Sequence, residues 1–180
     1  MTERLSMLEL NKNVDAPWQT EFLHISRTLM NLNYNVYLEG KVFAFQPKPQ
    51  VNIFELSDLQ AIYSDWKTYK DLKIEGQIKE TSFIWSQNVI NTCLTASGED
   101  RIEPYKTIPS NLLTPLFRDK ELLYFFWNSI EMKFKMPPTQ VFCHQPSDGS
   151  YFNGIFWEFC FIYLHPLSGT GVVLAGAAVD

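Results

Sequence analysis

The stretch Ile155–Leu164 reads I-F-W-E-F-C-F-I-Y-L, in which nine apolar or aromatic side chains surround a single carboxylate, Glu158. A short apolar run rich in β-branched and aromatic residues is typical of a core strand. Successive side chains of a strand point to opposite faces, so Glu158 shares a face with Cys160 while Phe159 takes the other. The stretch predicts the central strand of a sheet, and Glu158 is the position that breaks its apolar pattern.

The last third of the chain is predicted to form a β-meander around this strand. Residues 139–145 lead through a Pro-Ser-Asp-Gly turn into a strand over 151–165, which returns through 166–171 to a final strand over 172–179. A turn centred on Ser168 sets small residues opposite large ones: Ala175 opposite Phe161, Ala177 opposite Phe159 and Gly176 opposite Cys160. Such pairs leave room for a helix or a ligand over a shallow strand.

The segments before the meander carry both helix and strand patterns. Apolar steps of three and four predict a helix over 15–32, and a capping box at Ser57 predicts a second helix over 58–70. Two short alternating runs around Glu39-Gly40 predict a hairpin.

The region between these elements and the meander is less regular. Residues 73–96 contain two β-branched and aromatic runs that predict two strands, although the apolar spacing also matches one face of a helix. Residues 97–111 read as a polar loop, and Thr114-Pro115 begins a helix that ends before Pro137. Six consecutive apolar residues within it predict a helix that is buried on every side.

These elements predict one α+β domain over residues 1–180. We expect an antiparallel sheet that ends in a three-stranded C-terminal meander and is packed on one face by about three helices. A curved meander of this kind can form a cone with an internal cavity. A chain of 180 residues buries roughly 70% of its unfolded surface, so the fold needs neither a disulfide nor a metal.

The composition limits the compartment and the partners. Hydrophobic residues make up 46% of the chain, the net charge is −5, and no run of Lys or Arg forms a stripe for a phosphate backbone, so we expect no nucleic-acid partner. The longest apolar run is about half the length of a membrane-spanning helix, and the start of the chain lacks the apolar core of a secretory signal. Cys93, Cys143 and Cys160 form an odd set without CxxC spacing, which favours a soluble, cytoplasmic protein.

Four residues near the C-terminus are of the types that bind zinc: Cys143, His144, Cys160 and His165. If Cys143 pairs with a residue near position 153, Cys160 lies on the order of 20 Å away, whereas zinc ligands must converge on one ion. Cys143 and His144 are adjacent on a strand and point to opposite faces, which also argues against a nucleophile pair. We therefore expect no metal and no other cofactor.

Glu158 is the one candidate for a catalytic group. A buried, isolated carboxylate must either pair with a cation or raise its pKa and stay protonated, and such groups serve as general acids and bases. The structural alternatives are a solvated strand face or an ion pair with one of three cations: Arg118, Lys133 or Lys135.

Candidate binding residues lie in the predicted loops. They are the aromatic and acidic residues Tyr105, Asp148, Tyr151 and Phe152. Aromatic side chains on polar loops are common on protein-binding surfaces, although they can also fold back over the core.

The sequence contains no catalytic, nucleotide or nucleic-acid motif, so it leaves open whether the protein is an enzyme. We interpret it as a non-catalytic protein-binding or accessory module that docks on a protein partner. The alternative is a binder of a small apolar ligand, or an enzyme, with an apolar cavity and Glu158 as acid or base. The sequence does not indicate the oligomeric state.

Overall fold

The structure is a computed structural model. It describes residues 36–63, 74–95, 102–104, 123–124, 126–128, 131, 138–147 and 157–178. Within them, the strands are β1 (Val36–Ala44), β2 (Gln77–Thr81), β3 (Gln140–Gln145), β4 (Trp157–His165) and β5 (Thr170–Ala178). The helices are α2 (Leu56–Tyr63), α3 (Phe83–Thr95) and the short 3-10 helix η3 (Pro166–Ser168). The predicted helix over 15–32 and most of the predicted loop over 97–111 lie outside the described residues.

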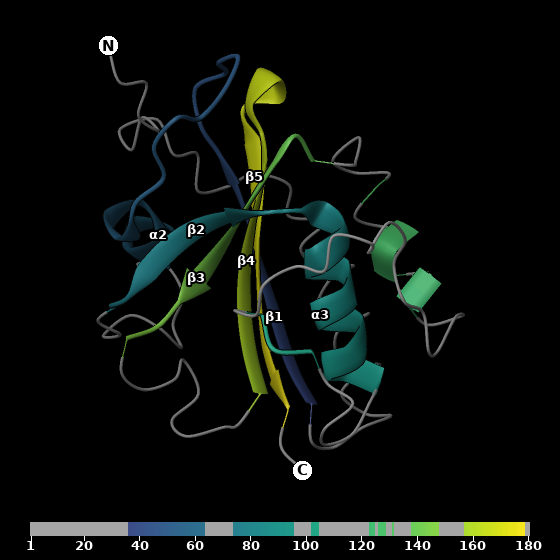
Figure 1. Cartoon of the computed structure of the whole chain (residues 1–180). Coiled ribbons are helices and arrows are strands. Elements are labelled where there is room, and N and C mark those ends of the chain that lie inside the picture. The colour runs from purple at the N-terminus through teal and green to yellow at the C-terminus, as the bar shows by residue number, and fades with distance from the viewer. Residues whose placement is uncertain are drawn as a thin grey trace.

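The five strands form one sheet in the order β1-β5-β4-β3-β2, and each neighbouring pair is antiparallel (Figure 1). β3, β4 and β5 are consecutive in the chain and adjacent in the sheet. The predicted α+β fold with a three-stranded C-terminal meander is therefore confirmed. No helix in the described part of the chain is long and apolar enough to cross a membrane.

The predicted register of β4 and β5 is wrong by one residue. Phe161 pairs with Leu174 rather than with Ala175, because the turn consists of four residues, 166–169, and its centre falls before Ser168. Opposite residues of an antiparallel pair point to the same face, so the one-residue difference separates the side chains of Phe161 and Ala175 onto opposite faces. The other two predicted pairs change likewise: Ala177 lies opposite Glu158 and Gly176 lies opposite Phe159.

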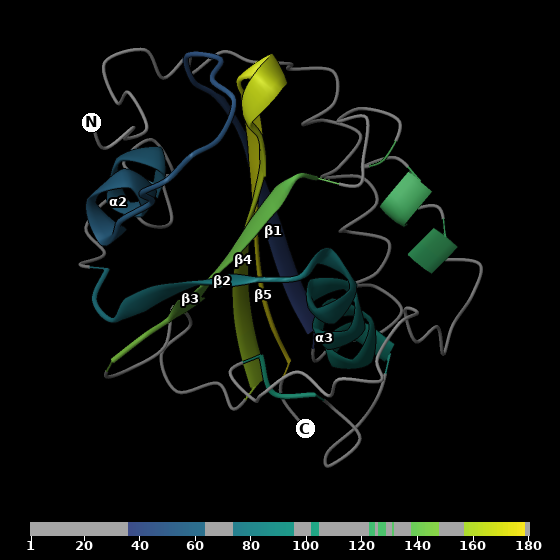
Figure 2. The same ribbon diagram turned by 45° about the horizontal axis from the view of Figure 1, so that its top comes forward.

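The two main helices cover opposite faces of the sheet, whereas we expected helices on one face. Figures 1 and 2 show α2 on one side of the strands and α3 on the other. Alternate residues of β4 divide between them: Phe159, Phe161 and Tyr163 pack in the cluster that contains α3, and Cys160, Ile162 and Leu164 in the cluster that contains α2. Both faces need a cover because β4 is apolar at almost every position.

The predicted hairpin around Glu39-Gly40 is wrong, since β1 runs through these residues as a single strand. All nine residues of β1 pair with β5, from Val36 opposite Ala178 to Ala44 opposite Thr170. This long ladder pairs more backbone groups than a short hairpin would. The turn signal at Gly40 is thus overridden by pairing with a distant segment of the chain.

The two strands predicted over 73–96 are corrected to β2 followed by α3. Ser82 caps the helix, because its Oγ accepts a hydrogen bond from the Trp85 backbone N–H at 3.1 Å. Residues 83–95 therefore follow the helical spacing of apolar residues that the sequence also showed. Packing against β4 and β5 decides in its favour over the β-propensity of the individual residues.

The second predicted helix begins at Leu56, earlier than expected, and is described as far as Tyr63. The predicted capping box at Ser57 is also displaced. The Asp58 carboxylate accepts a hydrogen bond from the Glu55 backbone N–H at 2.8 Å, so Glu55 occupies the cap position. A carboxylate in the first turn also suits the positive end of the helix dipole.

α3 is buried on its polar side as well as on its apolar side. Its buried polar residues are Ser86, Gln87, Asn88, Asn91 and Thr92. Segments after the helix cover this side: the Trp127 indole N–H donates to Asn91 Oδ1 at 2.7 Å, and the Ile102 backbone N–H donates to Thr92 Oγ1 at 3.0 Å. α3 therefore lies between the sheet and a further layer of the chain.

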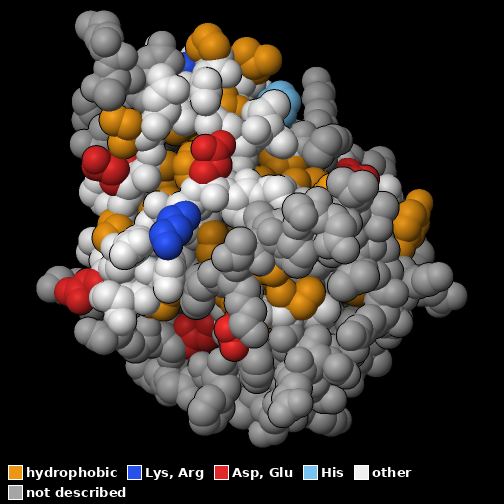
Figure 3. Space-filling view, viewed as in Figure 1, with side chains coloured by type: hydrophobic (Ala, Val, Ile, Leu, Met, Phe, Trp, Pro, Cys, Tyr) orange, Lys and Arg blue, Asp and Glu red, His pale blue; other side chains and the backbone are white. Residues whose placement is uncertain are grey.

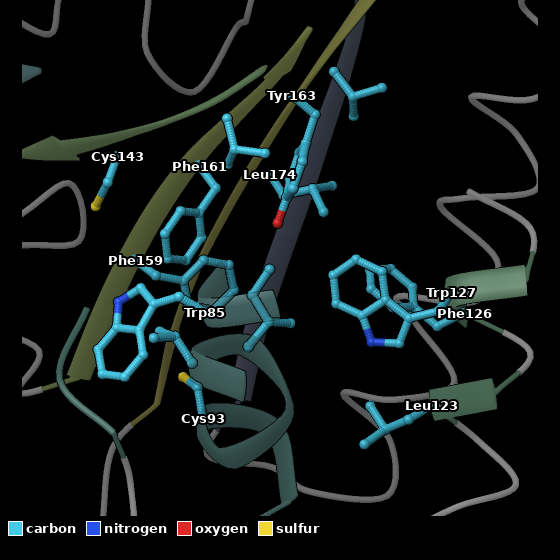
Figure 4. Close-up of a cluster of buried hydrophobic side chains, with 14 of the residues drawn as sticks. Trp85, Cys93, Leu123, Phe126, Trp127, Cys143, Phe159, Phe161, Tyr163 and Leu174 are labelled. Atoms are coloured by element: carbon cyan, nitrogen blue, oxygen red, sulfur yellow. The ribbon is translucent and has the colours of Figure 1, made fainter. Parts of the chain in front are cut away.

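The described part of the apolar run over 122–127 corrects one expectation. Leu123, Phe126 and Trp127 are buried in the cluster shown in Figure 4, but Tyr124 is 63% exposed. The run therefore has a solvent-facing side, and the prediction that it is buried on every side is wrong.

Candidate functional site

Glu158 lies in β4, half-buried, on the face that α2 covers. It pairs with Ala177 of β5, and Cys160 follows it on the same face. Its Oε1 atom is buried. The predicted alternation of this strand is confirmed, whereas the three candidate cations, at positions 118, 133 and 135, lie outside the described residues.

The two cysteines of the meander are buried on opposite faces of the sheet. Cys143 packs in the α3 cluster and Cys160 in the α2 cluster, where the Tyr63 hydroxyl lies 3.1 Å from its Sγ. Burial raises the pKa of the Cys160 thiol to about 12, and burial also raises that of Cys143. Both side chains are therefore thiols at neutral pH, and a thiol is a poor nucleophile and a poor metal ligand.

The four residues considered as zinc ligands do not converge. Cys143 pairs with Phe161, so the expected pairing with a residue near position 153 is wrong. The distance of about 20 Å along the strand that followed from that pairing is wrong as well. The better argument against a zinc site is that the two thiols lie on opposite faces of the sheet and point away from each other. Within the described residues, no three His, Cys, Asp or Glu side chains are grouped as a metal ion requires.

The two described histidines are engaged in separate contacts. His144 is buried, with Nε2 at 2.9 Å from the Glu75 carbonyl oxygen, and burial lowers the pKa of its imidazole. His165 is half-buried beside η3, with Nδ1 at 2.7 Å from Ser168 Oγ.

The contact between His165 and Ser168 is one of several that Ser168 makes within the turn. Ser168 Oγ lies 2.7 Å from His165 Nδ1, 3.0 Å from the His165 carbonyl oxygen and 2.7 Å from Thr170 Oγ1. Ser168 and His165 therefore form a turn-stabilising contact.

The predicted binding residues Tyr105, Asp148, Tyr151 and Phe152 all lie outside the described residues. The structure adds a surface feature that the sequence analysis missed. Leu167 stands in η3, at the end of the β4–β5 hairpin, and is 69% exposed. The exposure of Leu167 could have been expected from its position in a tight turn between a proline and a serine, where no neighbouring residue suggested a core contact.

Comparison with known proteins yields a similarity to a solved structure. No protein-family model matches the chain, and no curated protein matches it. The chain is similar to a crystal structure of citrus MAF1, with a TM-score of 0.47 and 14% sequence identity. The similarity covers 88% of this chain and 98% of that chain. A likeness at this level carries no statement about function.

Proposed function

We propose that the protein is a non-catalytic protein-binding or accessory module that acts in the cytoplasm by docking on a protein partner. The main support is a contrast between its interior and its surface. The described reactive side chains are dispersed in separate, mostly buried contacts, while a large apolar side chain, Leu167, is presented to solvent.

The hydrogen bonds of the interior support a structural role for the buried polar side chains. The Tyr163 hydroxyl donates to Ser86 Oγ at 2.9 Å, and the side-chain amide of Gln140 both donates to and accepts from the backbone of Val51, at 2.9 and 2.8 Å. These bonds hold helices and loops against the sheet. Three buried free cysteines are compatible with a reducing compartment, and the net charge of −5 disfavours a nucleic-acid partner.

Affinity capture followed by reconstitution tests the proposal. The full chain serves as bait in an extract of its native host, and each co-purifying protein is then purified and mixed with the chain. We expect one protein to form a complex of defined stoichiometry in size-exclusion chromatography. If no co-purifying protein forms a complex with the purified chain, the binding-module proposal is wrong.

The alternative proposal is a small-molecule binder or enzyme that uses Glu158. The observation that favours it is a carboxylate with a buried oxygen next to the small side chain of Ala177. Glu158→Gln tests it through urea unfolding at pH 4 to 8. Stability that falls as the pH rises, and that Glu158→Gln restores, would show a raised pKa, as this proposal requires. Stability lost as the pH falls would indicate an ion pair, and identical profiles would remove the only candidate acid or base.

A further inference from the structure

Two segments that are distant in sequence form one surface at the end of the β4–β5 hairpin. The Phe45 backbone N–H donates to the Gly169 carbonyl at 2.8 Å, and the Lys48 backbone N–H donates to the Pro166 carbonyl at 3.0 Å. These bonds join the loop after β1 to the turn that contains η3, and Figures 1 and 2 show the two segments side by side. We call residues 46–50 and 165–168 together the hairpin platform.

Backbone hydrogen bonds and close packing constrain the platform. The Gly169 N–H donates to the Pro166 carbonyl at 3.0 Å, and Gly169 adopts a left-handed φ of 67° that disfavours other residues. A Cβ at Gly169 would overlap the Phe45 carbonyl oxygen and press on the Pro47 ring, so the segments fit closely. A surface fixed before binding loses little conformational entropy on association.

Leu167 projects from this fixed surface. Its side chain is 69% exposed, and Pro47 and Pro49 of the neighbouring loop are also exposed. In Figure 3, hydrophobic side chains gather at the end of the molecule that carries η3, beside a Lys or Arg and a His. A leucine at the apex of a tight turn is convex, so its complement is a pocket rather than a flat face.

The charge of the platform differs from that of the whole chain. The net charge of the chain is −5, yet residues 40–54 and 159–179 contain no Asp or Glu. The platform itself carries Lys48 and His165. Docking through these two segments would place Lys48, and no carboxylate of either segment, against the partner, which favours a partner surface with carboxylates there.

We propose that the hairpin platform is the docking surface and that Leu167 inserts into an apolar pocket with an acidic rim on the partner protein. This inference rests on the proposed function and names the site and the chemistry of the partner. The rigid turn supplies the shape, the exposed leucine supplies the apolar contact, and the absence of carboxylates from both segments allows an acidic rim to approach.

The test uses the full chain and the purified partner from the reconstitution described above. Replacing a central apolar anchor commonly costs tenfold or more in affinity, so we expect Leu167→Ala to raise the Kd by about tenfold and Leu167→Asp by more. Tyr124→Ser removes the other exposed large hydrophobic side chain in the described residues and is the matched control. We expect it to change the Kd less than about twofold, within the range of near-neutral positions.

A charge pair at exposed Gln46 tests the acidic rim separately. Gln46→Lys should lower the Kd and Gln46→Glu should raise it, and both changes should shrink at high salt. Equal affinity of wild type and Leu167→Asp would overturn the docking surface while leaving the binding-module proposal intact. Equal or reversed effects of the Gln46 variants would overturn the acidic rim. If no partner binds the wild-type chain, the proposed function and this inference both fail.

Discussion

The two faces of β4 carry different kinds of side chain and are covered by different helices. Toward α3 it presents aromatic rings, and the cluster there includes Phe161, Tyr163 and Trp127 (Figure 4). Toward α2 it presents Cys160 and aliphatic side chains such as Ile162. β4 thus contributes aromatic rings to the α3 face and aliphatic side chains to the α2 face, where the aromatic rings of Phe43, Phe54 and Phe142 come from other segments.

This difference shows which forces position each helix. Apolar burial is proportional to area and has no direction, and the contact of the Tyr63 hydroxyl of α2 with Cys160 Sγ involves sulfur, a weak hydrogen-bonding partner, so α2 is fixed less closely than α3. The bonds from Tyr163 to Ser86 and from Trp127 to Asn91 have fixed lengths and directions, and their groups are buried. Buried polar groups of this kind allow few alternative packings, because each alternative leaves a donor without an acceptor.

The largest expected effect comes from truncating the aromatic face. Phe161 is fully buried and stacks toward Phe159, with ring centroids 5.9 Å apart. Phe161→Ala should lower the free energy of unfolding by about 3–5 kcal/mol, the range for buried phenylalanine. Phe142→Ala removes the same ring from the α2 face, where Phe142 is 8% exposed, and should cost about 3 kcal/mol, the lower end of that range. Urea unfolding measures both, and equal losses would contradict the difference between the faces.

The next effect tests the directed bonds on the α3 side. Asn91→Ala leaves the buried Trp127 indole N–H without the acceptor that it has at 2.7 Å, which should cost about 1–3 kcal/mol. Trp127→Phe removes the donor, and the double variant completes a thermodynamic cycle. A positive coupling energy of 0.5 kcal/mol or more, roughly the lower bound for contacting residues, is expected. Additive losses would show that the bond contributes nothing specific.

A similar cost is expected for a side chain added at Gly171, on the α2 face of the sheet. Gly171 pairs with Phe43 across β1 and β5, and a Cβ at Gly171 would overlap the Phe43 ring. Gly171→Ala should therefore destabilise the protein by about 1–3 kcal/mol through overpacking. Combining it with Phe43→Leu, which shortens the obstructing side chain, should recover part of the loss. A fully tolerated Gly171→Ala would mean that the Phe43 ring shifts more readily than we infer.

The sequence predicted the meander correctly because the residues that specify its strands and turn lie close together in the chain. The stretch Ile155–Leu164 is apolar at nearly every position, and Pro166 and Gly169 mark the turn that follows. The register was missed by one residue because the number of residues in a turn depends on backbone angles such as the left-handed φ of Gly169. A single residue in the turn decides which face every later side chain takes.

The errors elsewhere come from contacts that are distant in sequence. The turn signal at Gly40 gave way to pairing with β5, more than 130 positions away, and the β-branched residues of α3 became helical against the sheet. The candidate site shows the same limit. The sequence singled out Glu158 from its apolar neighbours, but the exposure of Leu167 depends on the loop that packs beside it.

The smallest expected effect concerns His144, in β3, where it pairs with Ile78 of the edge strand β2. Burial lowers the pKa of its imidazole from 6.5, so the fold favours the neutral form. Above pH 6.5 both folded and unfolded chains carry neutral His144, and no stability is lost. As the pH falls from 6.5 toward the lower folded pKa, the unfolded state binds the proton first, so stability decreases. His144→Gln retains an amide N–H that can donate to the Glu75 carbonyl but does not titrate, and it should flatten the stability curve between pH 7 and 5 in urea unfolding. An unchanged slope in this variant would assign the acid sensitivity of the fold to other groups.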